Sequence, residues 1–212
     1  MAKVYFYYSA MNAGKSTVLL QSSYNYQERG MDTLLFAPNF DTRFGDPAIY
    51  SRIGIKQSAT LYEKDFDFFR HTSLALNTKN HLACLLIDEA HFLTKLQTSQ
   101  LVHVAKKLNI PVLCYGLRSD FLGNPFEGSI YLLAWAEKLI EIKTICFCGK
   151  KATMNMRIDS NGNPVKTGSQ IQIGGNESYA SVCLNHFIEK VGPLNTHYLN
   201  EKINDDTTAS TK

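Results

Sequence analysis

The sequence has 212 residues, 44% of them hydrophobic and 19% charged, a balance typical of one globular domain or of one domain with a small attachment. The formal net charge is only +3, and the longest basic runs are the pairs Lys106-Lys107 and Lys150-Lys151. This argues against a nucleic-acid-binding protein, which needs clustered Lys and Arg. No stretch approaches the roughly 18 apolar residues that a membrane span requires, so no membrane partner is expected.

Short apolar runs alternate with helical patterns along the first 145 residues. The run Leu82 to Ile87 is continuous and ends in Asp88-Glu89, which is typical of a strand buried in a parallel sheet. Residues 39–51 are rich in Asp, Gly, Pro and Asn, which predicts a long loop. Strands are expected at 4–8, 33–37, 82–87, 112–116 and 138–145, and helices at 15–28, 63–76, 94–108 and 129–136. This order predicts an α/β fold with a parallel sheet flanked by helices.

The composition changes near Ile145, where the sequence becomes rich in Cys, Gly and Asn. We therefore expect a larger domain over 1–144, a second, smaller domain over 145–192 and an unstructured polar tail over 193–212. The first six residues contain one basic residue and no small-residue cleavage site follows them. They predict a first strand and a cytoplasmic protein.

The strongest motif lies between the first strand and the first helix. A phosphate-binding loop brings backbone N–H groups close to phosphates, so bulky side chains are excluded where the chain is tightest, and Gly14 meets this need. Lys15 is expected to reach the β- and γ-phosphates, and the Ser16 hydroxyl to ligate Mg²⁺. The pattern has Gly at its first position, where this chain has Ser9. The loop consists of Ser9, Ala10, Met11, Asn12, Ala13, Gly14, Lys15 and Ser16.

The acid pair Asp88-Glu89 is the second motif. In a phosphate-loop fold, an acid at the end of a buried strand beside the first strand holds Mg²⁺ through its water shell, a role expected of Asp88. The next carboxylate, Glu89, is expected to act as a general base towards the acceptor hydroxyl. In the structural alternative, the two acids only cap the loop and helix that follow the strand.

Four residues near the C-terminal end form the third motif. Three thiolates and one imidazole make a tetrahedral Zn²⁺ set, and Gly149 lets the chain turn after the first pair. The alternative is a group of free cysteines in a core. Cys84 and Cys114 lie inside apolar strands and are expected to be small core residues. The predicted ligands are Cys146, Cys148, Cys183 and His186.

These signals alone predict a phosphate-loop protein that uses a nucleoside triphosphate and holds structural zinc, without identifying the phosphoryl acceptor. With all the motifs in order, residues 1 to about 190 resemble the thymidine kinase family of the cellular and bacterial type. The matching segments are Ser9 to Ser16, Asp41-Thr42-Arg43, Ile87 to Phe92, Tyr115 to Phe121 and Ile171 to Tyr179. The Gly-Gly-Asn-Glu-x-Tyr string within the last segment is the most family-specific of them.

The resemblance implies an ATP-dependent enzyme that phosphorylates the 5′-hydroxyl of thymidine, with Glu89 as the general base. It implies that the small domain carries a lasso loop over the nucleoside, that Tyr179 contacts the deoxyribose, and that Arg43 lies in a segment tied to substrate and phosphate binding. It places Ala90 and His91 beside the nucleotide. It also implies a homotetramer and feedback inhibition by thymidine triphosphate. Backbone contacts to thymine are assigned to Ile171, Gln172, Ile173, Gly174 and Gly175, and an apolar wall to Met11, Phe92, Leu117, Phe121 and Phe126.

The chain departs from the family at His91, where Gln is common, so a hydrogen bond specific to that amide is not expected. Plain core packing remains the alternative for each aromatic residue of the wall. Asp88-Glu89-Ala90-His91 also spells a DExH helicase box, but a helicase needs two ATPase lobes and a charged strand-tracking groove. A zinc-ribbon binding module would have no use for the phosphate loop. A kinase for another deoxynucleoside on the same scaffold is the remaining alternative.

Overall fold

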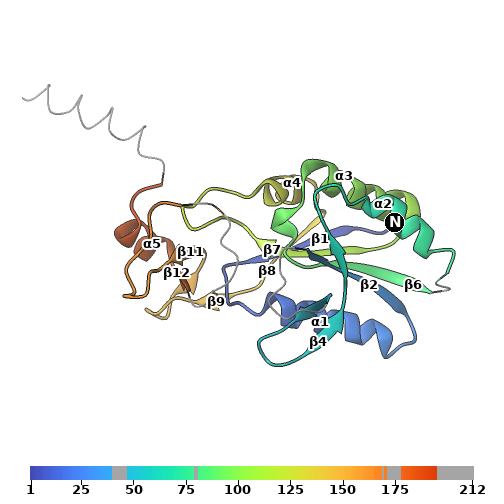
Figure 1. Ribbon diagram of the computed structural model, residues 1–212, viewed down its shortest axis with the longest axis horizontal. Helices are drawn as coiled ribbons and strands as arrows, with labels where there is room; N and C mark the ends of the chain where they lie inside the picture. Colours follow the sequence, from blue (N-terminus) through green and yellow to red (C-terminus); the bar gives the residue numbers. More distant parts are fainter. Residues whose placement is uncertain (40–46, 79–80, 169, 171–177, 195–212) are drawn as a thin grey trace, which may run out of the picture.

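The computed structural model describes residues 1–39, 47–78, 81–168, 170 and 178–194 (Figure 1). Within them, six parallel strands form one sheet in the order β5-β2-β6-β7-β1-β8, which confirms the predicted α/β architecture. The strands are β1 (Val4–Ser9), β2 (Asp32–Pro38), β5 (Thr60–Tyr62), β6 (Leu82–Ile87), β7 (Val112–Leu117) and β8 (Lys138–Glu141). The predicted strand 138–145 is divided, because only β8 pairs with β1 while Thr144–Ile145 forms the separate β9.

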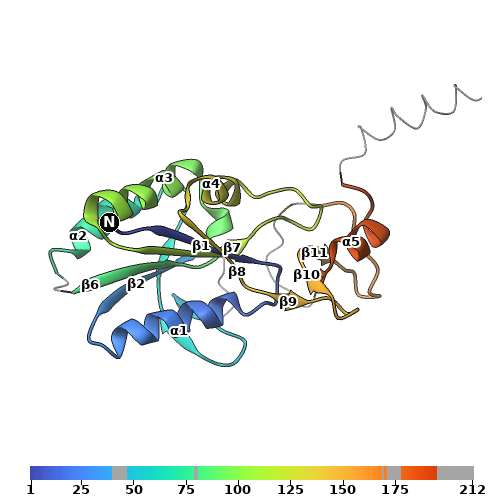
Figure 2. The same ribbon diagram turned by 180° about the vertical axis from the view of Figure 1, so that it is seen from behind.

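Helices cover both faces of this sheet (Figures 1 and 2). One face carries α1 (Lys15–Gln27) together with an antiparallel hairpin of β3 (Ala48–Tyr50) and β4 (Lys56–Ser58). The opposite face carries α2 (Phe68–Ala75), α3 (Lys95–His103) with the π-helical turn η2 (Val104–Leu108), and α4 (Glu127–Trp135). The prediction of a loop over 39–51 was wrong for β3, whose partner strand follows only after the turn at Arg52–Gly54.

Local capping sets where two of these helices begin. The Asp67 side chain accepts a hydrogen bond from the Arg70 N–H, so α2 begins at Phe68 and the predicted start at residue 63 was wrong. Thr94 and Gln97 form a reciprocal capping box at the start of α3. Satisfying these N–H groups fixes the ends of the helices that pack on the sheet.

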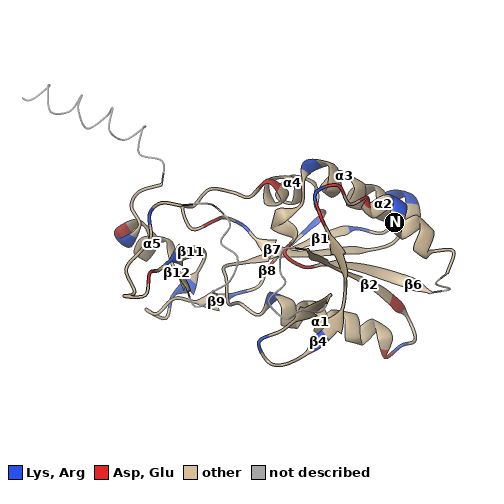
Figure 3. Ribbon diagram, in the orientation of Figure 1, with Lys and Arg blue, Asp and Glu red and all other residues tan. Residues whose placement is uncertain are grey.

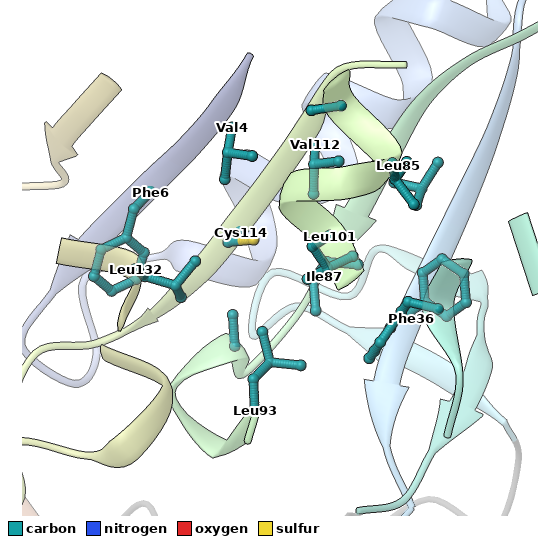
Figure 4. Packing of buried hydrophobic residues seen from close by; sticks show 14 of the residues in the cluster. Val4, Phe6, Phe36, Leu85, Ile87, Leu93, Leu101, Val112, Cys114 and Leu132 are labelled. Carbon is teal, nitrogen blue, oxygen red and sulfur yellow. The ribbon is translucent and has the colours of Figure 1, made fainter. Parts of the chain in front are cut away.

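The central strands β6 and β7 bury both of their faces, as parallel strands covered by helices do. Val4 and Phe6 of β1 pack in the cluster beneath α2, α3 and α4, which Figure 4 shows from close by. Tyr5 and Tyr7 of the same strand pack against the cluster on the α1 face. Burying one large apolar side chain contributes about 1.5–3 kcal/mol to the stability of the fold. The two clusters together therefore stabilise the sheet that carries the loops at its edge.

A separate cluster forms a small lobe beyond the carboxyl ends of β1 and β8. It consists of Cys146, Ala152, Met154, Met156, Val182, Cys183 and Phe187. Two antiparallel pairs and one helix frame it, namely β9 (Thr144–Ile145) with β10 (Lys151–Ala152), β11 (Met154–Arg157) with β12 (Tyr179–Val182), and α5 (Leu184–Lys190). This lobe lies at one end of the elongated molecule (Figure 1).

Charged residues are spread over the whole described chain. Lys and Arg positions occur on both the sheet domain and the small lobe, interspersed with Asp and Glu (Figure 3). Among the helices of the described residues, none is both long enough and apolar enough to cross a membrane.

Candidate active site and zinc site

The loop between β1 and α1 has the backbone shape of an anion cradle. Asn12 has φ 60° and Gly14 has φ 84°, so two residues of this short loop adopt the left-handed conformation. Alternation of this kind turns backbone N–H groups towards one point, where an anion is bound. A Cβ at Gly14 would meet nothing within 4 Å among the described residues, so glycine is favoured here by its φ and not by crowding.

Lys15 is held inside the loop. Its side chain is only 8% exposed, and Nζ donates to Ser9 Oγ at 3.3 Å and to the Ala10 carbonyl at 3.4 Å. Burial lowers the pKa of Lys15, while the charges of Glu89 and Asp88 oppose this shift. Ser9, which stands where the motif has Gly, therefore supplies a hydroxyl that accepts from the lysine.

Ser16 and Asp88 meet across the sheet edge. The Ser16 hydroxyl donates to Asp88 Oδ2 at 3.2 Å, and the Glu89 N–H donates to Asp88 Oδ1 at 3.0 Å. Burial raises the pKa of Asp88 to about 7, and the neighbouring Glu89 charge adds to the shift. The strand carrying Asp88 was expected beside β1, but β7 lies between β6 and β1. The contact forms nevertheless, because α1 begins opposite the end of β6.

Glu89 sits on a sharp turn immediately after β6. Its φ of 46° and ψ of 40° place a non-glycine residue in the left-handed region at the start of η1 (Ala90–Phe92). The buried Tyr62 hydroxyl at the end of β5 lies 3.2 Å from both the Asp88 and the Glu89 carbonyl oxygens. Sequence reasoning missed Tyr62, since β5 has only three residues and carries no motif.

His91 anchors the same turn to β7. Its Nδ1 accepts a hydrogen bond from the Leu117 N–H at 3.2 Å. A Cβ at Gly116 would lie 2.9 Å from the His91 backbone nitrogen, so the glycine allows this close approach. Glu89 Oε2 lies 3.5 Å from Nδ1. An ion pair would require a proton on Nδ1, which instead accepts from Leu117, and burial holds the pKa of His91 well below its ordinary value. His91 is therefore neutral.

The predicted apolar wall falls into two groups. Phe92 and Phe126 meet edge to face at 5.6 Å, and both contact the His91 ring. Phe121 lies further along, with the Arg157 guanidinium 3.7 Å from its ring centre. Arg157 also donates from Nε and Nη2 to the Tyr179 hydroxyl, at 2.9 and 2.7 Å.

Some of the remaining predicted residues lie within the described part of the chain and others do not. Leu117 is buried at the end of β7, and Met11 is half-buried in the loop. Ala90 is fully buried in the core cluster beneath α3 and α4. The sequence predicted none of the contacts of Arg157, which depend on the pairing of β11 with β12. Arg43, Ile171, Gln172, Ile173, Gly174 and Gly175 lie outside the described residues.

The Cys and His residues of the third motif come together in the small lobe. One ligand atom from each of Cys146, Cys148, Cys183 and His186 lies within 4.8 Å of all the others. Gly149, with φ 80°, makes the turn after the first pair, and the Phe147 ring stacks on His186 at 4.3 Å. Three sulfurs and one imidazole nitrogen at this spacing fit tetrahedral Zn²⁺. Cys84 and Cys114 are buried in the sheet, as predicted.

In this parallel sheet, β1 leads through the phosphate loop into α1. The loop holds a buried lysine, and the serine that follows it pairs with an acid at the end of another strand. These features define a phosphate-loop nucleotide-binding protein. Comparison with known proteins narrows this class. The family whose sequence model matches residues 2–187 is described as Thymidine kinase.

Curated relatives agree with this match over nearly their full length. The thymidine kinase of Coxiella burnetii is 58% identical over 187 residues, covering 88% of this chain and 95% of the relative. That of Pasteurella multocida is 58% identical over 191 residues, covering 90% and 99%, and that of Vibrio cholerae is 56% identical over 192 residues, covering 91% and 100%. The chain belongs to the thymidine kinase family.

Proposed function

We propose that this chain transfers the γ-phosphoryl group of ATP to the 5′-hydroxyl of thymidine, with Glu89 as the general base. Membership of the thymidine kinase family makes it a phosphotransferase that acts on thymidine. The observation that carries the residue assignment is the convergence of Lys15, Ser16, Asp88 and Glu89 at one edge of the sheet.

On the donor side, backbone amides of the phosphate loop and the Lys15 ammonium would hold the phosphates of ATP. Ser16 and Asp88 would hold Mg²⁺, since a hydroxyl and a carboxylate are oxygen ligands that this ion prefers. When bound, Mg²⁺ neutralises negative charge on the phosphates. The serine hydroxyl and the buried carboxylate already lie 3.2 Å apart, so little rearrangement is needed to place both on one ion.

On the acceptor side, the Glu89 carboxylate takes the proton of the 5′-hydroxyl. The 5′-oxygen then forms its bond to the γ-phosphorus while the bond to the ADP oxygen breaks. The backbone around Glu89 is fixed by Tyr62 on one side and by His91 on the other, which orients the carboxylate. Following the family resemblance, we assign thymine to the backbone of 171–175 and to the apolar wall, the deoxyribose to Tyr179, and substrate and phosphate contacts to Arg43.

The small lobe has a structural role in this proposal. Zn²⁺ on the Cys/His set would tie β9–β10 to the start of α5, and it takes no part in the chemistry. The separate hydrophobic cluster supports two units, 1–144 and 145–192. None of the five cysteines, all within the described residues, forms a disulfide, which suits the reducing cytoplasm where we place the enzyme.

We also propose a homotetramer and feedback inhibition by thymidine triphosphate. Support for assembly comes from α4 and its surroundings, where Ile130, Trp135 and Leu139 are 47%, 37% and 48% exposed. Large apolar side chains left exposed to this extent are candidates for protein–protein contact. Thymidine triphosphate would place its base in the nucleoside site and its phosphates in the phosphate loop, so one molecule would block both substrates.

The test is a panel of nucleosides with ATP and Mg²⁺, scored by formation of the 5′-monophosphate. The proposal expects thymidine to be the preferred acceptor, with deoxycytidine, deoxyadenosine and deoxyguanosine turned over far more slowly. Preference for another deoxynucleoside would overturn the substrate assignment, and ATP turnover stimulated by single-stranded DNA would overturn the reaction itself.

A further inference from the structure

Two side chains of the small lobe hold the backbone of one phosphate-loop residue. The Met11 N–H donates to Asn155 Oδ1 at 2.7 Å. The Ser181 hydroxyl donates to the Met11 carbonyl oxygen. Asn155 lies on β11 and Ser181 on β12, and the two residues are direct partners in that antiparallel pair. The backbone N–H and carbonyl of Met11 are thus both bound by one pair of facing residues in β11 and β12.

Asn155 makes a second contact that ties in a third segment. Its side chain is only 2% exposed, and its Nδ2 donates to the Ser119 carbonyl oxygen at 2.8 Å. Ser119 follows β7, on the segment that leads to Phe121. A single buried amide therefore connects the phosphate loop, the segment after β7 and the small lobe, with both ends of its side chain satisfied.

The direction of the Met11 N–H has a consequence for the cradle. This N–H points to Asn155, so the anion must be bound by the amides that follow it in the loop. The positions of those amides depend on Met11, because Asn12 and Gly14, which adopt left-handed conformations, lie only one and three residues further along the chain. The turn between β1 and α1 extends towards β11 and β12 in both views (Figures 1 and 2).

We infer that Asn155 and Ser181 are positioning residues for phosphoryl transfer, which set the shape of the phosphate loop by clamping Met11. The inference rests on the proposed function only in that this loop binds ATP. The clamp makes the small lobe part of the ATP site, although no residue of the lobe belongs to the phosphate-loop motif. Since β12 ends at Val182, next to the zinc ligand Cys183, the clamp is also joined to the zinc site.

The experiment measures the dissociation constant of a non-hydrolysable ATP analogue with Mg²⁺, in the absence of thymidine, so that the nucleoside pocket does not enter the result. Ser181→Ala removes one hydrogen bond, and Ser181→Thr keeps the hydroxyl. Ser160→Ala is the matched control, since Ser160 is exposed in the turn of the same lobe. Asn155→Ala removes two hydrogen bonds, with exposed Asn161→Ala as its control. Zinc content and the thermal unfolding midpoint show which variants fold.

Ser181→Ala is expected to raise the dissociation constant about threefold to tenfold, the range for one net hydrogen bond. Ser181→Thr should stay within about twofold of wild type, and folded Asn155→Ala should lose at least about tenfold. A folded, zinc-replete Ser181→Ala that binds the analogue as wild type does overturns the clamp, even where Asn155→Ala does not fold. If that enzyme still phosphorylates thymidine, the proposed function stands. A wild type that binds no ATP analogue overturns both.

Discussion

The Ser16 hydroxyl in the first turn of α1 donates a hydrogen bond to Asp88 at the end of β6, across 3.2 Å and 72 positions of sequence. In the sheet, β7 separates β6 from β1, the strand that leads into α1, so the contact joins segments that follow two non-adjacent strands. It brings the proposed Mg²⁺ ligands together before any ion binds.

Removing the Ser16 hydroxyl tests this pairing. Ser16→Ala should lower kcat/KM for ATP about 10- to 100-fold, because a hydrogen bond or ligand to a charged group contributes about 1.5–3 kcal/mol. Ser16→Thr should keep most of the activity, since threonine supplies the same oxygen. Ser22→Ala, on the same helix but bonded to Val18 and Tyr115, is the control. Equal activity of Ser16→Ala and Ser22→Ala would contradict the assignment.

Zinc should be present at one ion per chain. Cys183→Ser should lose the ion and loosen the small lobe, because closed four-ligand sites contribute directly to folding. Thymidine affinity should fall most, and ATP affinity should also fall through the clamp on Met11. Metal analysis and equilibrium binding check both effects. Cys84→Ala, in the sheet core, should keep its zinc. Purified wild-type protein without zinc would rule the site out.

His91 should make stability depend on pH. Its folded-state pKa lies below the unfolded value of about 6.5, because burial and the Lys15 charge disfavour the imidazolium. The unfolded chain therefore binds more protons below that pH, and stability falls as pH falls from about 6.5 towards the folded-state pKa. The maximum slope for one proton is about 1.4 kcal/mol per pH unit.

The comparison variant is His91→Gln, which cannot take up this proton. Urea unfolding at pH 5.5, 6.5 and 7.5 should give wild type a steeper loss of free energy than the variant below pH 6.5, with Glu89 and Lys15 unchanged in both. Parallel pH profiles for the two proteins would show that His91 titrates normally in the folded state.

Thymidine triphosphate should inhibit by occupying both half-sites. Its base would take the nucleoside position while its phosphates enter the loop around Gly14 and Lys15, so the affinity should exceed that of thymidine. Inhibition should be competitive with thymidine. Tyr179→Ala should weaken both ligands, since it removes the ring assigned to the deoxyribose, whose hydroxyl Arg157 holds in place. Purely non-competitive inhibition, or inhibition insensitive to this change, would place the triphosphate elsewhere.

The central strands were predictable because burial on both faces leaves a continuous apolar run. The range Leu82–Ile87 was predicted with its observed bounds, and the loop from Ser9 to Ser16 follows from glycine conformation and phosphate chemistry. The start of α2 was not, because the Asp67 cap overrides the helical pattern from residue 63. The strand β3 was read as loop, since its three residues lie among turn formers.

The candidate site likewise contains features that the sequence predicted and features that it did not. The clustering of Cys146, Cys148, Cys183 and His186 was predictable because metal chemistry restricts both residue type and spacing. Tyr62, Asn155 and Ser181 were not, because each acts on a backbone group far away in the sequence, and an ordinary Tyr, Asn or Ser carries no local signal of such a partner. The order of strands in the sheet was likewise decided by crossovers that the periodicity does not record.

The most direct measurement of the central claim is the steady-state rate of Glu89→Gln with saturating ATP, Mg²⁺ and thymidine. Glutamine keeps the shape of the side chain and removes the base. We predict that kcat falls about 10²- to 10⁴-fold, the usual contribution of a positioned base. The dissociation constants of both substrates should change little. Glu141→Gln, whose carboxylate pairs with Lys151 in the wild type, should retain full activity. A Glu89→Gln enzyme with a tenth or more of the wild-type kcat would contradict the account.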